Sequence, residues 1–165
     1  MTQLSRILLP GEGESVQIGT TTHTTFKAQG SETDGKLGLY EHRMDPGAPG
    51  ASPHVHNEQL EAFYVLHGLV ELHLDGKSFA APPGTYVNVP MGVSHGFHNP
   101  YQDQATMLII FTPALNREEY FRGLAEMYAD GRKPSEDELL ALMAKYDQFE
   151  VTMDGKDAPA NWGRH

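Results

Sequence analysis

Four residues of the types that bind metals lie in two short stretches of the chain. His54 and His56 are two positions apart, so on an extended strand both imidazoles lie on the same face. Glu61 begins an apolar segment, and a hairpin there can fold its carboxylate back beside the two histidines. His95 follows a Pro-Met-Gly turn and is well placed to add a third nitrogen from a neighbouring strand. Three imidazoles and one carboxylate suit one divalent transition metal (Mn, Fe, Co, Ni, Cu or Zn) and can leave open the coordination positions that catalytic sites need.

Histidine is the unusual residue of this chain. There are nine histidines and no cysteine, and seven of the histidines lie between His42 and His98. The absence of cysteine excludes disulfide scaffolds, cysteine-ligated metal centres and thiol nucleophiles. His42 shares an expected strand with Tyr40, and the alternation there leaves open whether both side chains line a pocket. His98 is expected on the strand face opposite to that of His95, exposed or hydrogen-bonded.

Length and charge limit the class of protein and the partners. A chain of 165 residues fits one domain, and 12 basic against 22 acidic residues give a net charge of −10. This balance lacks the basic surface that nucleic acid or anionic lipid requires, so we expect neither as a partner. No apolar run approaches the roughly 20 residues that span a membrane. The first residues lack a long apolar segment, so we expect a cytoplasmic protein.

The elements that must position the four residues are strands. Val70, Leu72 and Leu74 alternate with polar residues, and Asp75-Gly76 is a preferred hairpin turn. Roughly eight or nine such short segments, separated by glycine and proline, predict an antiparallel barrel or sandwich between residues 16 and 113. The expected segments include a strand over Val16–Phe26, a strand over Leu37–Met44 and a loop over Asp45–Pro53.

The period changes to helical after Pro113. Asn116 with Glu119, and Ser135 with Glu138, resemble capping boxes that begin two amphipathic helices. We expect these helices to pack outside the barrel or to extend a subunit interface. The predicted organisation is a lead-in over residues 1–15, a barrel over 16–113, a helical appendage over 114–150 and a poorly ordered tail over 151–165.

Two motifs in the correct order identify a resemblance to the cupin superfamily. The first cupin motif, G-x5-H-x-H-x(3 or 4)-E-x6-G, is matched at every position except the leading glycine, where Ala48 stands. The second, G-x5-P-x-G-x2-H-x3-N, is matched throughout. The matching residues are His54, His56, Glu61 and Gly68 in the first motif and Gly84, Pro90, Gly92, His95 and Asn99 in the second. The resemblance implies an all-β jelly-roll barrel, here with two C-terminal α-helices, in which His54, His56, Glu61 and His95 hold a divalent metal.

A narrower similarity concerns function. The stretches HVHNEQLEAFYVLHG, VPMGVSHGFHNP and MLIIFTPA resemble single-domain bacterial cupins of the quercetinase kind. This resemblance implies a dioxygenase that uses dioxygen on a flavonol-like or other enolisable aromatic substrate, with Glu61 as the catalytic base. Two alternatives stay open: a non-oxidative cyclase, isomerase or decarboxylase with the same metal, and a cupin that binds a small molecule without catalysis. Cupins are often dimers, so we also expect a homodimer.

Strand parity selects the candidate substrate-binding residues. Phe63 and Val65 share parity with Glu61, and Phe97 shares parity with His95. On the last long strand, either Met107 and Ile109 or Leu108 and Ile110 point inward. The expected pocket wall consists of Tyr40, Phe63, Val65, Phe97, Met107 and Ile109, although core packing explains these residues equally well. Such a wall suits an apolar or aromatic small molecule, and the acidic balance favours a neutral substrate over an anionic one.

Overall fold

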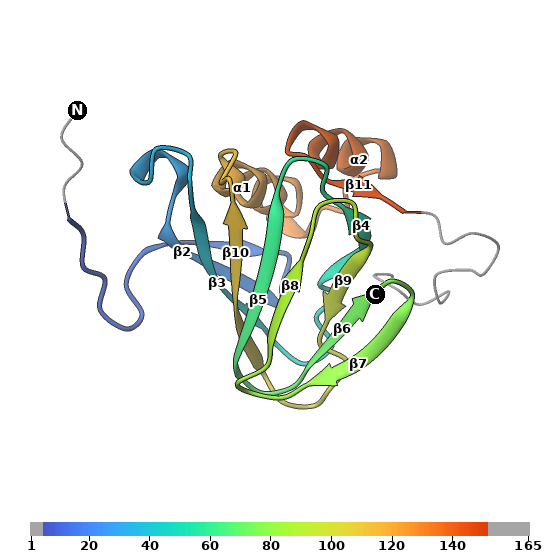
Figure 1. Cartoon of the computed structure of the whole chain (residues 1–165). Helices are drawn as coiled ribbons and strands as arrows, with labels where there is room; N and C mark the ends of the chain where they lie inside the picture. The colour runs from blue at the N-terminus through green and yellow to red at the C-terminus, as the bar shows by residue number, and fades with distance from the viewer. Residues whose placement is uncertain (1–4, 152–165) are drawn as a thin grey trace.

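Two antiparallel sheets form a sandwich in the computed structural model, which describes residues 5–151 (Figure 1). One sheet has six strands in the order β1-β2-β3-β10-β5-β8, and the other has five in the order β11-β4-β9-β6-β7. The first sheet contains β1 (Glu14–Ile18), β2 (Thr22–Ala28), β3 (Gly38–Met44), β5 (Leu60–His67), β8 (Tyr86–Val89) and β10 (Ala105–Thr112). The second contains β4 (Ala51–Val55), β6 (Val70–Leu74), β7 (Lys77–Ala81), β9 (His95–His98) and β11 (Phe149–Glu150).

This arrangement confirms the predicted all-β jelly roll with two C-terminal helices. Its form is a sandwich of two sheets and not a fully closed barrel. The predicted hairpin turn is also present, because Asp75 and Gly76 adopt φ values of 46° and 75° between β6 and β7.

Strand boundaries differ from the prediction at two places. The single strand expected over Val16–Phe26 is two strands, β1 and β2, because Gly19 at a φ of 60° allows a turn between them. The expected loop over Asp45–Pro53 ends earlier than predicted, since β4 begins at Ala51 and pairs with β9. Strand β11 was not predicted, because two residues carry no periodic signal.

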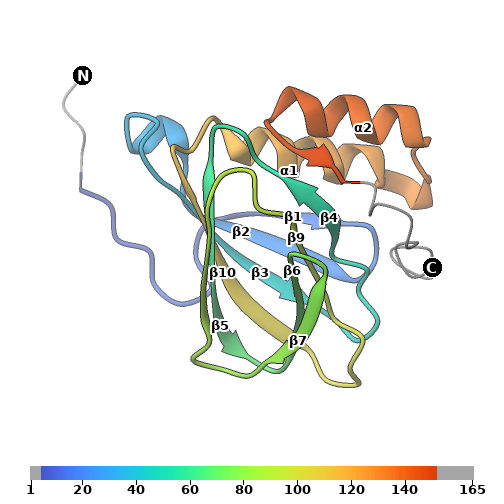
Figure 2. The same ribbon diagram turned by 45° about the vertical axis from the view of Figure 1, so that its right-hand side comes forward.

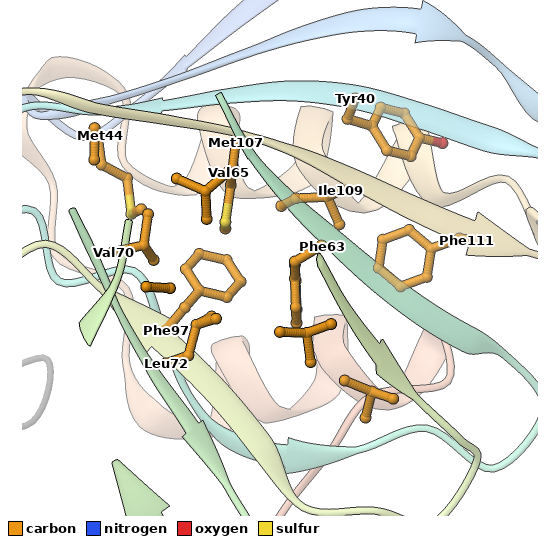
Figure 3. Packing of buried hydrophobic residues seen from close by; sticks show 14 of the residues in the cluster. Tyr40, Met44, Phe63, Val65, Val70, Leu72, Phe97, Met107, Ile109 and Phe111 are labelled. Atoms are coloured by element: carbon orange, nitrogen blue, oxygen red, sulfur yellow. The ribbon is translucent and has the colours of Figure 1, made fainter. Parts of the chain in front are cut away.

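Alternating residues of the two sheets fill the space between them. Met107, Ile109 and Phe111 on β10 are at most 1% exposed, whereas the intervening Leu108 and Ile110 are half-buried on the outer face. This resolves the parity of β10 that the sequence left open. Figure 3 shows these side chains beside the rings of Phe63 and Phe97, whose centroids are 5.5 Å apart.

The helices lie together at one end of the sandwich (Figure 2). They are α1 (Arg117–Met127) and α2 (Glu136–Lys145), with the short 3-10 turn η2 (Ala129–Gly131) between them in the chain; a second 3-10 turn, η1 (Gly30–Glu32), follows β2. The capping box of Ser135 and Glu138 is confirmed at the start of α2. The box predicted for Asn116 is wrong, because Asn116 has a φ of 53° and its side chain caps no backbone N–H.

The described structure begins at residue 5 and ends at residue 151. Residues 1–4 of the lead-in and 152–165 of the tail lie outside the described residues. The peptide N–H of Val151 donates to the carbonyl of Pro53, so the described chain remains attached to β4 up to its last residue. Within residues 5–151, no helix has the length and apolar character needed to cross a membrane.

Candidate metal centre

The four candidate ligands come together inside one end of the sandwich. His54 lies on β4, His56 follows that strand directly, and His95 begins β9 opposite His54 in the strand register. Glu61 lies on β5 of the other sheet. One ligand atom from each of these residues lies within 4.8 Å of the others, and all four side chains are buried. The cluster therefore joins the two sheets.

Each imidazole of the cluster is oriented by a backbone carbonyl. The three Nδ1 atoms donate to the carbonyls of Ser52 (from His54, 2.7 Å), Val93 (from His95, 2.8 Å) and Asp147 (from His56). When Nδ1 carries the proton, Nε2 keeps the lone pair that a metal requires. The backbone thus presents three Nε2 atoms to the common centre.

Glu61 occupies the middle of this set. Its Oε2 atom is 2.6 Å from Nε2 of His95, 3.0 Å from Nε2 of His56 and 3.8 Å from Nε2 of His54. The last nitrogen is buried and has no hydrogen-bond partner among the described residues. A buried nitrogen without a partner beside a carboxylate is the arrangement that a bound cation completes. The donor set is compatible with one divalent metal.

Electrostatics keep Glu61 and His54 in the forms that bind metals, whereas the carboxylate of Glu61 raises the pKa of His95 against the effect of its burial. Burial alone would raise the pKa of Glu61, but the charge of the neighbouring His95 and the other imidazole nitrogens beside the carboxylate outweigh it and hold that pKa well below its ordinary value. Burial lowers the pKa of His54 to about 4. An ionised carboxylate and a neutral imidazole are both ligand forms.

Asp147 supports the site and was missed by the sequence analysis. Its carboxylate accepts the peptide N–H groups of Asn57, Glu58 and Gln59 at 3.0, 2.8 and 3.1 Å, which fixes the loop between His56 and Glu61. Its carbonyl accepts a hydrogen bond from Nδ1 of His56. The residue has a φ of 56° just after α2. A polar residue after a helix signals a helix end, but it does not identify a partner 90 positions away.

A cavity of about 1100 Å³ opens from the cluster toward the helices. His54 and Glu61 belong to its wall, and its other side is formed by α1, η2 and α2. The apolar part of the wall includes Phe97, Ile109, Phe111, Tyr120, Phe121 and Leu124. A volume of this size accommodates an aromatic molecule of several rings beside the ligand set.

Comparison with known proteins agrees with the fold and the ligand set. The family model described as "Cupin domain" matches residues 40–111, which include all four candidate ligands. The chain carries a cupin domain. Quercetin 2,3-dioxygenase from Bacillus subtilis is 32% identical over 130 residues, which cover 78% of this chain and 37% of the relative. The cupin chain thus spans just over a third of the length of that relative.

Solved structures show the same cupin fold. A predicted oxalate decarboxylase from Thermotoga maritima has a TM-score of 0.61 at 17% identity, covering 66% of this chain and 99% of that one. A polyketide cyclase from Streptomyces resistomycificus has a TM-score of 0.56 at 19% identity, covering 72% and 94%. At these identities the likeness concerns the fold alone.

The six candidate substrate-binding residues form two groups according to whether they line the cavity. Phe97 and Ile109 line the cavity. The other four, Tyr40, Phe63, Val65 and Met107, are fully buried in the core and are absent from the cavity wall. A substrate contact for these four therefore stays a prediction, because parity shows which face of a strand points inward, but not how far along the strand the open space extends. The hydroxyl of Tyr40 donates to Glu118 at 2.9 Å, which explains its burial.

Two further polar residues lie on the cavity wall. His42, which the sequence left undecided, lines the cavity, and its Nδ1 is 2.9 Å from the hydroxyl of Thr24. Arg117, the first residue of α1, was not predicted as a wall residue, because its neighbours in sequence indicated only the start of a helix. His98 lies away from the cavity and stacks on His73 with ring centroids 5.5 Å apart.

Proposed function

We propose that this cupin is a metal-dependent dioxygenase that acts on a flavonol-like or other enolisable aromatic substrate. The observation that carries the proposal is a buried set of three histidines and one glutamate that opens onto a large, mainly apolar cavity. The 32% identity to a quercetin 2,3-dioxygenase supports the same chemistry.

Each part of the site has a distinct role in this proposal. His54, His56, Glu61 and His95 would hold the metal, which supplies Lewis acidity and a template for substrate and dioxygen. The ionised Glu61 also accepts the proton of the substrate hydroxyl, within reach of the cavity that its side chain lines. The rings of Phe97 and Phe111 hold the aromatic substrate and exclude water.

Oxygen consumption tests this function. Protein loaded separately with Mn, Fe, Co, Ni or Cu is given quercetin in an oxygen electrode, and at least one form should consume dioxygen. Glu61→Gln should abolish uptake, whereas Glu136→Gln, the same change at an exposed position on α2, should leave it unchanged. Dioxygenase activity on flavonols is excluded if every loaded form is inactive while elemental analysis shows bound metal. Conversion of an enolisable probe without oxygen would instead identify a cyclase, isomerase or decarboxylase.

We also propose that the protein is a cytoplasmic homodimer without a nucleic-acid partner. The outer face of the six-stranded sheet carries exposed Tyr64, Leu66 and Tyr86 next to half-buried Leu108 and Ile110. A contiguous apolar surface of this kind favours association with a second copy. Light scattering in solution gives the mass that decides between one and two chains of 18.2 kDa.

A further inference from the structure

The cavity wall contains a buried cation without an acidic partner. Arg117 is 3% exposed and lines the cavity. Its Nη1 donates to the carbonyl of Tyr146 at 2.8 Å and its Nη2 donates to the side chain of Gln148. Its Nε is buried without a partner, and no carboxylate among residues 5–151 lies within ion-pair distance of the guanidinium.

A buried positive charge destabilises the folded protein unless an anion pairs with it. Transfer of an unpaired ion from water into the protein interior is strongly unfavourable, and neutral acceptors compensate for only part of that cost. Two aromatic rings compensate for a further part of this cost, because the guanidinium carbon lies 4.6 Å from the centre of the Phe111 ring and 4.1 Å from the centre of the Tyr120 ring. These contacts hold the cation in place, and the carboxylates of Glu61 and Asp147 act on its charge only from beyond ion-pair distance.

The position of Arg117 connects it to the ligand set. Phe111, on which the guanidinium stacks, has its ring 5.5 Å from the imidazole of His56. With a divalent ion bound, three neutral imidazoles and one carboxylate would carry a net charge of about +1. Of the other charged wall residues, Arg117, Arg132 and Lys133 are positive and Asp130 is negative, so the wall adds further positive charge. A ligand that enters this cavity therefore meets a positive field, although the chain as a whole carries −10.

We propose that Arg117 binds an anionic oxygen of the substrate, so that the cavity selects aromatic or enolic compounds with a carboxylate or an ionised hydroxyl group. The inference rests on the proposed function for the location of the substrate, and it adds the substrate's charge. It replaces the neutral substrate that the overall acidic composition favours. A second buried atom of the wall, Nε2 of His42, also has no hydrogen-bond partner and suits a further polar group of the same ligand.

A pair of probes of nearly identical shape tests the charge preference. Zinc-loaded protein is titrated with 1-hydroxy-2-naphthoate and with 1-hydroxy-2-naphthamide by calorimetry, in the absence of oxygen so that no oxidation can occur. The wild type should bind the carboxylate at least about tenfold more tightly than the amide, as a charge-assisted hydrogen bond in a buried site predicts. Equal affinities for the two probes would overturn the proposal.

Substitutions then assign the preference to one residue. Arg117→Met, which keeps an unbranched apolar stem and removes the charge, should reduce the preference to less than about threefold. Arg122→Met removes the same charge from α1 where the arginine pairs with Glu14 and Glu119, and it should keep the wild-type preference. An unchanged preference in folded Arg117→Met would also overturn the proposal.

Two arrangements keep the test independent of folding and of the proposed reaction. If Arg117→Met does not fold, Arg117→Lys takes its place, because lysine keeps the charge but lacks the planar guanidinium. The preference of Arg117→Lys for the carboxylate probe should be weaker than that of the wild type, but the two probes should not bind equally. A preference equal to that of the wild type would contradict the role of the guanidinium. Oxygen uptake with quercetin can succeed while the charge preference is absent, and it can fail while the preference is present, so the two proposals fail separately.

Discussion

Histidines with similar burial have different roles in this domain because their ring nitrogens have different partners. His54, His56 and His95 each direct Nδ1 to a backbone carbonyl, so Nε2 remains an acceptor at the centre of the cluster. His42 is 4% exposed, but its Nδ1 faces the hydroxyl of Thr24 and its Nε2 remains unpaired on the cavity wall. The partner of Nδ1, and not burial itself, thus separates candidate ligands from a wall residue.

The burial of His42 predicts a pH dependence of stability. Burial lowers the pKa of His42 to about 4, against the opposing influence of Glu61, so the unfolded chain binds this proton before the folded protein does. The stabilisation is complete above about pH 6.5 and is lost as the pH falls toward 4. When the pH is lowered from 7 to 5, the unfolding free energy of the wild type should fall by on the order of 2 kcal/mol more than that of His42→Gln. Urea titrations of the metal-free proteins at both pH values measure this difference, and equal losses in the two proteins would contradict it.

At the scale of elements, the C-terminal helices act on the site through the segment that follows them. Asp147, two residues after α2, fixes three peptide groups of the loop between β4 and β5, and its carbonyl accepts a hydrogen bond from Nδ1 of His56. Arg117 at the start of α1 reaches the same region through Tyr146 and Gln148. The helical appendage therefore completes the cavity and orients one of the candidate ligands.

Asp147→Gly should weaken metal binding without changing the four candidate ligands. Glycine tolerates the φ of 56° at this position, so the change removes the carboxylate without adding backbone strain. Loss of a group that supports metal ligands typically reduces affinity by about 10- to 100-fold. Competition with a chromophoric zinc chelator measures this reduction. Asp34→Gly is the matched control, because Asp34 has a φ of 53° on an exposed loop, and it should bind zinc as the wild type does. Wild-type affinity in Asp147→Gly would remove the segment after α2 from the site.

The sequence could predict the residues that strand spacing brings together, but not those that reach the site through the packing of helices. The spacing of His54, His56 and Glu61 reports directly on strand geometry, so the sequence could group these residues. Asp147 and Arg117 reach the site through the docking of helices, which no local pattern encodes. Phe63 and Phe97 have the same inward parity, yet Phe97 alone of the two lines the cavity, because the extent of the open space depends on where α1 and α2 cover the sandwich.

For the whole molecule, the metal centre is a link between two sheets. Glu61 belongs to the six-stranded sheet, whereas His54 and His95 belong to the five-stranded sheet. In the described structure, the carboxylate already contacts imidazoles across the sandwich at 2.6 and 3.0 Å. A divalent ion would strengthen this link, because it binds all four side chains together only when both sheets are in place.

Metal binding should therefore raise the thermal stability of the entire domain. An ion that binds the folded state alone at 100 times its Kd adds about 2.7 kcal/mol, which corresponds to roughly 5–10 °C in Tm for a chain of this size. Calorimetric scans with and without zinc measure the shift, and a chelator should reverse it. In Glu61→Gln the shift should be much smaller, because the six-stranded sheet loses its ligand while the three histidines remain on the other side. If zinc is bound but the Tm is unchanged, or if Glu61→Gln keeps the full shift, the cluster does not connect the sheets, and the histidines bind the ion without help from β5.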